Sequence, residues 1–204
     1  MGYHSAEADE RIASHIAELI DLFTANVVPQ NVYGIWDCQI TSSAVTLGGM
    51  TVHSHNLARH LEGCRRVVLL AATLGTEADT LIRRFSVQDM EKAVIAQAIC
   101  AAMIEAYGDE IESELAQKPE FDGLRPTARF SPGYGDFDIV HQKDILNMLH
   151  CSNIGLTLTD GYMLIPSKSV TAVIGFSPEK CAAEAMGKCE RCADTQCTFR
   201  KAVQ

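Results

Sequence analysis

Basic residues are scarce in this 204-residue chain compared with acidic ones. It carries 17 Lys and Arg against 26 Asp and Glu, a formal net charge of −9. Nucleic-acid backbones are bound by clustered basic residues, so this balance argues against a nucleic-acid partner. The longest uncharged apolar runs, 67–75 and 93–104, are too short to cross a bilayer, which predicts no membrane contact. The first residues show no basic region followed by an apolar one, so we expect no secretion signal and a cytoplasmic protein.

Three common catalytic signatures are also missing. The sequence has no phosphate-binding Walker loop, no Gly-x-Gly-x-x-Gly after a strand and no Gly-x-Ser-x-Gly elbow. The nearest approach, Gly133-Tyr134-Gly135, lacks the third glycine of a dinucleotide-binding fingerprint. A serine hydrolase therefore has little support.

The eight cysteines fall into two groups. Four are scattered among mostly apolar neighbours, where a free thiol behaves as a small hydrophobic side chain; they are Cys38, Cys64, Cys100 and Cys151. The other four crowd into the C-terminal tail, residues 179–204. In a cytoplasmic protein, crowded cysteines bind metal more often than they form disulfides.

The tail has the spacing Cys181-x7-Cys189-x2-Cys192-x4-Cys197. Four thiolates can hold a tetrahedral zinc ion or an iron-sulfur cluster, and the Cys-x2-Cys core is typical of both. The spacing matches neither the standard zinc-ribbon pattern nor the common ferredoxin run, so zinc and iron-sulfur both stay open. Free thiols are a less favourable alternative, since exposed thiols oxidise. We predict that these four cysteines are metal ligands.

Hydrophobic periodicity predicts interleaved helices and strands. Helices are expected over 9–25, from near Ser54, over 76–85, 87–117 and 139–150, and strands over 67–70 and 170–176. Thr76, with Asp79 three residues later, is expected to cap the helix that follows it. Thr159-Asp160-Gly161, between apolar segments, predicts a hairpin. A hairpin requires antiparallel strands, so the fold class is α+β, a twisted and mainly antiparallel sheet with flanking helices.

Three regions are expected in chain order. Residues 1–32 form an N-terminal helical segment, 33–178 an α+β domain, and 179–204 the Cys-rich tail. In the longest helix, Ala98, Ala101 and Gly108 share a face with Glu105. Small residues on one face indicate close approach of backbone or ligand, and a buried carboxylate there needs a cationic partner. That partner is either an arginine of the protein or a cationic group of a ligand.

The most informative segment, 129–136, reads Arg-Phe-Ser-Pro-Gly-Tyr-Gly-Asp. A core strand does not need this combination, because proline removes a hydrogen-bond donor and glycine has no side chain to pack. Functional loops do use it, since glycine permits unusual dihedral angles and close contact. Taken alone, an ordinary Pro-Gly turn after a strand explains the segment equally well.

Three segments together resemble the activation domain of cobalamin-dependent methionine synthase and, more closely, its free-standing bacterial relatives. They are 68–76 (Val-Leu-Leu-Ala-Ala-Thr-Leu-Gly-Thr), 129–136, and 166–175 (Pro-Ser-Lys-Ser-Val-Thr-Ala-Val-Ile-Gly). The resemblance covers most of the chain from about Tyr33 onward. The Cys-rich tail is similar to tails on free-standing members and differs from the synthase domain.

The resemblance implies a protein that binds S-adenosylmethionine and supports reductive methylation of an oxidised cobalamin. The implied ligand-binding residues are Glu105, Arg129, Ser131, Pro132, Gly133 and Tyr134. Arg129 would pair with the ligand carboxylate, a task suited to a planar bidentate donor. The backbone of 131–133 would contact the adenosyl portion, and Glu105 would lie near the ligand ammonium. Tyr134, the implied catalytic residue, would stand where methyl donor and corrin meet.

Two departures from the family shape the expected partners. The family's N-terminal acidic ligand residue has no counterpart that we can place in 1–32, and the chain lacks Asp-x-His-x-x-Gly, the signature of the loop that supplies histidine to cobalt. Cobalamin is therefore expected on a separate corrinoid protein or methionine synthase core. The electron would come from an iron-sulfur cluster in the tail, or from a donor such as flavodoxin or ferredoxin. Two alternatives stay open: a non-catalytic docking module with structural zinc, and a methyltransferase component for another acceptor.

Overall fold

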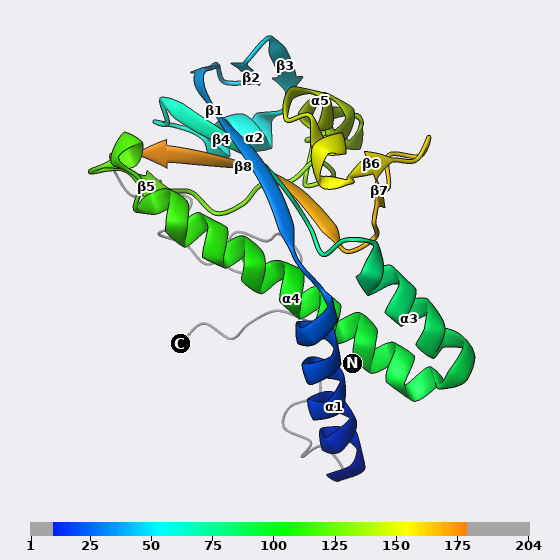
Figure 1. Cartoon of the computed structure of the whole chain (residues 1–204). Coiled ribbons are helices and arrows are strands. Elements are labelled where there is room, and N and C mark those ends of the chain that lie inside the picture. The colour runs from blue at the N-terminus through cyan, green and yellow to red at the C-terminus, as the bar shows by residue number, and fades with distance from the viewer. Residues whose placement is uncertain (1–9, 179–204) are drawn as a thin grey trace, which may run out of the picture.

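A six-stranded antiparallel sheet forms the centre of the molecule in a computed structural model that describes residues 10–178 (Figure 1). The strand order is β3-β2-β1-β4-β8-β5. The strands are β1 (Gln30–Ile40), β2 (Ala44–Leu47), β3 (Met50–His53), β4 (Arg66–Thr73), β5 (Arg125–Pro126) and β8 (Ser169–Ser177). A separate hairpin pairs β6 (Thr157–Leu158) with β7 (Leu164–Ile165) in the place predicted from Thr159-Asp160-Gly161. The α+β class is confirmed.

Helices cover both faces of this sheet (Figure 1). On one face lies the long α4 (Met90–Ala116), and α1 (Glu10–Asn26) and α3 (Thr76–Gln88) pack against it. The other face carries α2 (His55–His60) and α5 (Gln142–Met148). Short 3-10 helices occur at η1 (Pro119–Phe121), η2 (Ile139–His141) and η3 (Cys151–Ile154). None of the helices in the described residues is long and apolar enough to cross a membrane.

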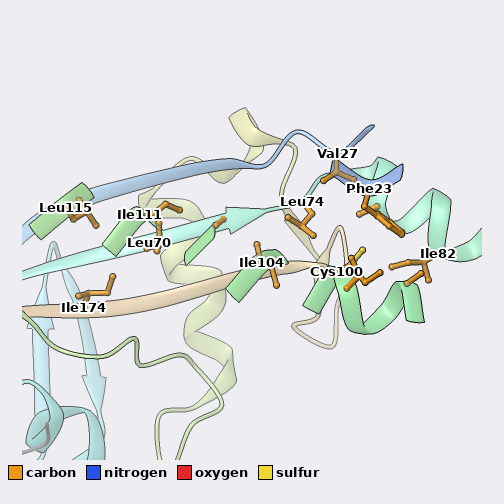
Figure 2. Close-up of a cluster of buried hydrophobic side chains, with 14 of the residues drawn as sticks. Phe23, Val27, Leu70, Leu74, Ile82, Cys100, Ile104, Ile111, Leu115 and Ile174 are labelled. Atoms are coloured by element: carbon orange, nitrogen blue, oxygen red, sulfur yellow. The ribbon is translucent and has the colours of Figure 1, made fainter. Parts of the chain in front are cut away.

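The central strand β4 belongs to both of the cores that result. Its residues alternate, so that Val68 and Leu70 pack against the α1/α3/α4 layer while Val67 and Leu69 pack against α2 and α5. A strand that is covered on both faces reads as a continuous apolar run, because successive side chains point to opposite sides. Figure 2 shows the first core, where Leu70 and Ile174 of the sheet lie against Ile104, Ile111 and Leu115 of α4.

The cap predicted for α3 and the start predicted for the longest helix are wrong. Thr76 is the first residue of α3 rather than its cap; the capping position is Gly75, which makes no side-chain cap. Asp79 accepts hydrogen bonds from the backbone and hydroxyl of Ser167 instead. The longest helix begins at Met90, because the side chain of Asp89 accepts from the backbone of Lys92 and caps it. A side-chain cap of this kind is a common way to satisfy the first amides of a helix.

The scattered cysteines are free thiols in mostly apolar surroundings, as predicted. Cys64, Cys100 and Cys151 are buried, and Cys38 is half-buried. Burial raises the pKa of the Cys100 and Cys151 thiols to about 11. Both remain protonated at neutral pH and act as packing groups rather than nucleophiles. The four cysteines predicted to bind metal lie outside the described residues.

Candidate functional site

The segment that holds the Arg-Phe-Ser-Pro-Gly-Tyr motif runs beside β8. The backbone amides of Thr127 and Phe130 donate to the carbonyls of Gly175 and Val173, at 2.8 and 3.0 Å. In an extended chain adjacent side chains point to opposite faces. Arg129 accordingly reaches α4 on one face, while Phe130 packs into the core on the other. The motif therefore lies at the edge of the sheet, between the two helical layers.

Arg129 is the centre of an ionic cluster on α4. Its Nη2 donates to Glu105 Oε2 at 2.9 Å and to Asp109 Oδ1 at 2.8 Å. Its Nη1 lies 3.1 Å from Glu112 Oε1. The Arg129 side chain is only 15% exposed, whereas those of Glu105 and Asp109 are 67% and 72% exposed. The guanidinium thus sits beneath two carboxylates that solvent, or a ligand, can reach.

The charges of this cluster do not cancel. One guanidinium faces three carboxylates, which leaves two negative charges in surplus when all are ionised. Burial lowers the pKa of Arg129, but Glu112, Asp109 and Glu105 outweigh it, so the pKa is raised above its ordinary value. Arg129 is a fixed cation, and the surplus negative charge favours a ligand that brings positive charge.

Gly108 makes room for the guanidinium. A Cβ at this position would lie 2.8 Å from Nη1 and 2.9 Å from Cζ of Arg129. Gly108 is the one member of the predicted small-residue face at which close approach is observed; Ala98 and Ala101 are exposed. The premise of a buried Glu105 was wrong, and the carboxylate pairs with an arginine of the protein, one of the two alternatives left open.

Replacing Gly108 with alanine is expected to weaken ligand binding more than it changes stability. Alanine favours a helix by about 0.5–1 kcal/mol over glycine, which offsets the displacement of a flexible guanidinium. The displaced Arg129 no longer meets its three carboxylates in one geometry, so we expect the affinity for the proposed ligand below to fall by about tenfold. Calorimetric titration and thermal unfolding measure the two effects. Ala101→Ser, on the exposed part of the same helix, is the control; an equal loss of affinity in both variants would contradict the prediction.

The remaining predicted residues form one tight turn after Arg129. Tyr134 N donates to Ser131 O at 3.1 Å, Phe137 N to Tyr134 O at 3.0 Å, and Gly133 N to Phe137 O at 2.7 Å. Gly133 has a φ of 92°, a value that side chains rarely adopt. Pro132 is buried within the turn.

Tyr134 is exposed at the surface of this turn. Tyr134 is 55% exposed, which is unusual for a large aromatic residue. Its ring meets Phe130 edge to face, with centroids 5.9 Å apart. Phe137, which closes the turn, is buried, and its ring stacks with Phe130. Tyr134 thus packs on an aromatic base and is exposed to solvent.

Sequence reasoning missed two carboxylates of the cluster. Asp109 and Glu112 follow Glu105 by four and seven residues, which places all three on one helix face. That spacing was the available signal.

A pocket of about 540 Å³ lies elsewhere in the molecule, between α5, η3 and the β6–β7 hairpin, and none of the cluster residues lines it. Within residues 10–178, no group of three or more His, Cys, Asp or Glu side chains is arranged to hold a metal ion.

Comparison with known proteins gives one family and one fold. Residues 57–197 match the family model described as "Vitamin B12 dependent methionine synthase, activation domain". Among solved structures, the chain is similar to "Crystal Structure of the MetH Reactivation Domain bound to AdoHcy", with a TM-score of 0.66 and 16% sequence identity. The match covers 84% of this chain and 66% of that one, and at such low identity it establishes the fold. No curated protein matches the sequence.

Proposed function

The chain belongs to the activation-domain family of vitamin B12 dependent methionine synthases, and on that premise we propose that it binds S-adenosylmethionine and supports reductive methylation of cobalamin on a separate protein. The observation that carries the proposal is the Arg129 cluster, a half-buried cation beside two exposed carboxylates, immediately before the turn that presents Tyr134. The similar reactivation domain is bound to AdoHcy, the product left when S-adenosylmethionine gives up its methyl group.

The charges of the ligand complement those of the cluster. S-adenosylmethionine carries a sulfonium, an ammonium and a carboxylate at neutral pH. In the proposed complex the ligand carboxylate takes the Nη2 hydrogen of Arg129 that Glu105 releases, and Glu105 turns to the ligand ammonium. Asp109 and Glu112 keep the guanidinium in place during this exchange. Glu105 is free to turn because most of its side chain faces solvent, at 67% exposure.

In the proposed complex the turn positions the methyl group that is transferred. The backbone of 131–133 contacts the adenosyl portion, and Tyr134 lies between the sulfonium and the arriving corrin. Once reduced by one electron, the partner's cobalamin supplies the nucleophile: a cobalt–carbon bond forms, the carbon–sulfur bond breaks, and its electron pair stays on sulfur. The chain contributes orientation and charge complementarity, since the cofactors carry the reactive centres.

Calorimetric titration of the full chain with S-adenosylmethionine tests this function. We expect saturable binding by a folded protein. No binding by a protein that is folded by circular dichroism would contradict the proposal and favour a docking module that grips a corrinoid partner without a methyl donor. A reconstituted assay with cobalamin on a corrinoid protein then asks whether the bound methyl group reaches cobalt or another acceptor.

The tail cysteines are proposed to bind a metal, with an iron-sulfur cluster as a local source of the electron. Protein prepared without oxygen is then expected to be brown and to absorb visible light. Joint replacement of Cys189 and Cys192 by serine should remove that absorbance. Cys38→Ser, outside the tail, is the matched control and should keep it. A colourless protein with one zinc per chain would contradict the cluster and assign the electron to an external donor.

A further inference from the structure

The short helix α2 is anchored firmly in the second core. Its capping residue Ser54 is 1% exposed, and the Ser54 hydroxyl accepts from the backbone of Leu57 at 2.9 Å. Leu57 and Ala58 are buried, as is Leu61 at the end of the helix. A six-residue helix of this kind gains its stability from packing rather than from its own length. It is therefore a fixed element against which a neighbouring loop can be held.

Asp136, two residues after Tyr134, is bound to the start of this helix. One carboxylate oxygen accepts from the backbone of His55 at 2.8 Å, and the other from the backbone of Asn56 at 3.1 Å and from the Ser54 hydroxyl. The Ser54 hydroxyl and these amides lower the pKa of Asp136, with burial opposing them. The side chain is exposed, yet it makes three hydrogen bonds across 80 or more residues of sequence.

The other end of α2 holds the same segment before Tyr134. His60 Nε2 lies 2.7 Å from the carbonyl oxygen of Ala128. The His60 ring packs against Phe130, with centroids 4.9 Å apart. Between the two ends, Gly135 passes so close to Asn56 that a Cβ would lie 2.4 Å from its side-chain nitrogen. The helix thus contacts the motif segment on both sides of Tyr134.

From these contacts we infer that α2 is the positioning element of the Tyr134 turn, and that Asp136 is the positioning residue through which it acts. The inference rests on the proposed function of Tyr134. Tyr134 itself is exposed and packs edge to face on Phe130, so the direction of its ring follows from the backbone of the turn. His60 fixes that backbone where it enters and Asp136 fixes it where it leaves. Without Asp136 the turn keeps its internal hydrogen bonds but loses the hydrogen bonds that hold it to the start of α2.

The neighbouring Asp138 provides a matched control. It is an exposed carboxylate in the same loop, and it accepts a hydrogen bond from the backbone of Val140, two residues away. That contact is local and caps η2. Asp138→Ala therefore removes a carboxylate and a helix cap of similar kind without touching α2 or the Tyr134 turn.

Two readouts on the full chain test the inference. The first is amide hydrogen exchange, which needs no ligand: Asp136→Ala is expected to speed exchange at His55, Asn56 and the turn amides by about tenfold or more, and Asp138→Ala is not. The second is methyl transfer to cobalamin on a corrinoid partner: in Asp136→Ala we expect kcat to fall by about tenfold while the affinity for S-adenosylmethionine changes less than about threefold.

A double-variant cycle separates positioning from general loosening. If Asp136 acts through Tyr134, then Asp136→Ala lowers kcat no further in a Tyr134→Ala background. Additive losses would overturn the inference, as would unchanged exchange in Asp136→Ala, or faster exchange with an unchanged kcat. Failure of the wild-type chain to bind S-adenosylmethionine is a different result: it removes the proposed function, while the exchange experiment still decides whether Asp136 holds the turn.

Discussion

Replacing Arg129 with alanine is expected to abolish detectable binding of S-adenosylmethionine in a calorimetric titration. Removing one partner of a desolvated charge pair costs about 2–5 kcal/mol, which corresponds to a loss of affinity of about 30-fold to several thousand-fold. The Arg129 side chain is 15% exposed, so its guanidinium is largely withdrawn from water even though Glu105 and Asp109 are not. The variant also leaves three carboxylates facing one another with no cation among them, and their repulsion spreads the residues that should meet the ligand ammonium.

Two other arginine variants serve as comparisons for Arg129→Ala. Arg129→Lys keeps the charge but loses the planar fork that meets two oxygens at once, so an intermediate loss is expected. Arg66→Ala is the control: its guanidinium is 43% exposed and stands 3.9 Å from a 94% exposed Asp37. Such exposed pairs are worth about 0–1 kcal/mol, and binding should be unaffected. Unchanged affinity in a folded Arg129→Ala protein would mean that the ligand binds elsewhere.

The parts of the fold that were predictable are those with a regular apolar pattern. β4 and β8 are buried over most of their length; the apolar run of β4 and the β-branched residues of β8 identified them. β1 was not identified, although it spans eleven residues and pairs with both β2 and β4. Most of its residues are half-buried rather than alternately buried and exposed, and a period of two is present only over its last five residues, 36–40.

The candidate site was predictable only in part, for a related reason. The motif at 129–136 is a continuous segment that can be recognised from its composition, whereas the residues that hold it in place are distant in the sequence. The contact of Arg129 with α4 joins residues 20 and 24 positions apart, and that of Asp136 with α2 spans about 80. Charged side chains on a helix usually face water, so Asp109 and Glu112 give no sign of a distant arginine. Tertiary packing decides such pairings, and helical periodicity alone shows only that the carboxylates share a face.

Replacing Gly175 with valine is expected to lower the free energy of unfolding by about 3 kcal/mol, because the inserted atoms meet a filled core. Gly175 lies in β8, and a Cβ there would be 2.5 Å from Cys64 Sγ and 2.7 Å from Leu61 Cδ2. Both neighbours are buried, at 6% and 0% exposure, so neither has free space to enter. For a chain of this size the unfolding midpoint should fall by roughly 6–12 °C.

The same substitution should also disturb the Tyr134 turn, because Leu61 directly follows α2 and Cys64 lies four residues beyond its end. If they are pushed away from β8, α2 moves with them, and His60 and Asp136 lose their common support. Faster amide exchange in the turn is therefore expected at temperatures where the rest of the chain is still folded. Gly161→Val is the matched control, since a Cβ there meets only Thr159 Oγ1, at 3.9 Å. Equal stability of the two valine variants would contradict the close packing of α2 on β8, and with it the physical basis for holding Tyr134 in place.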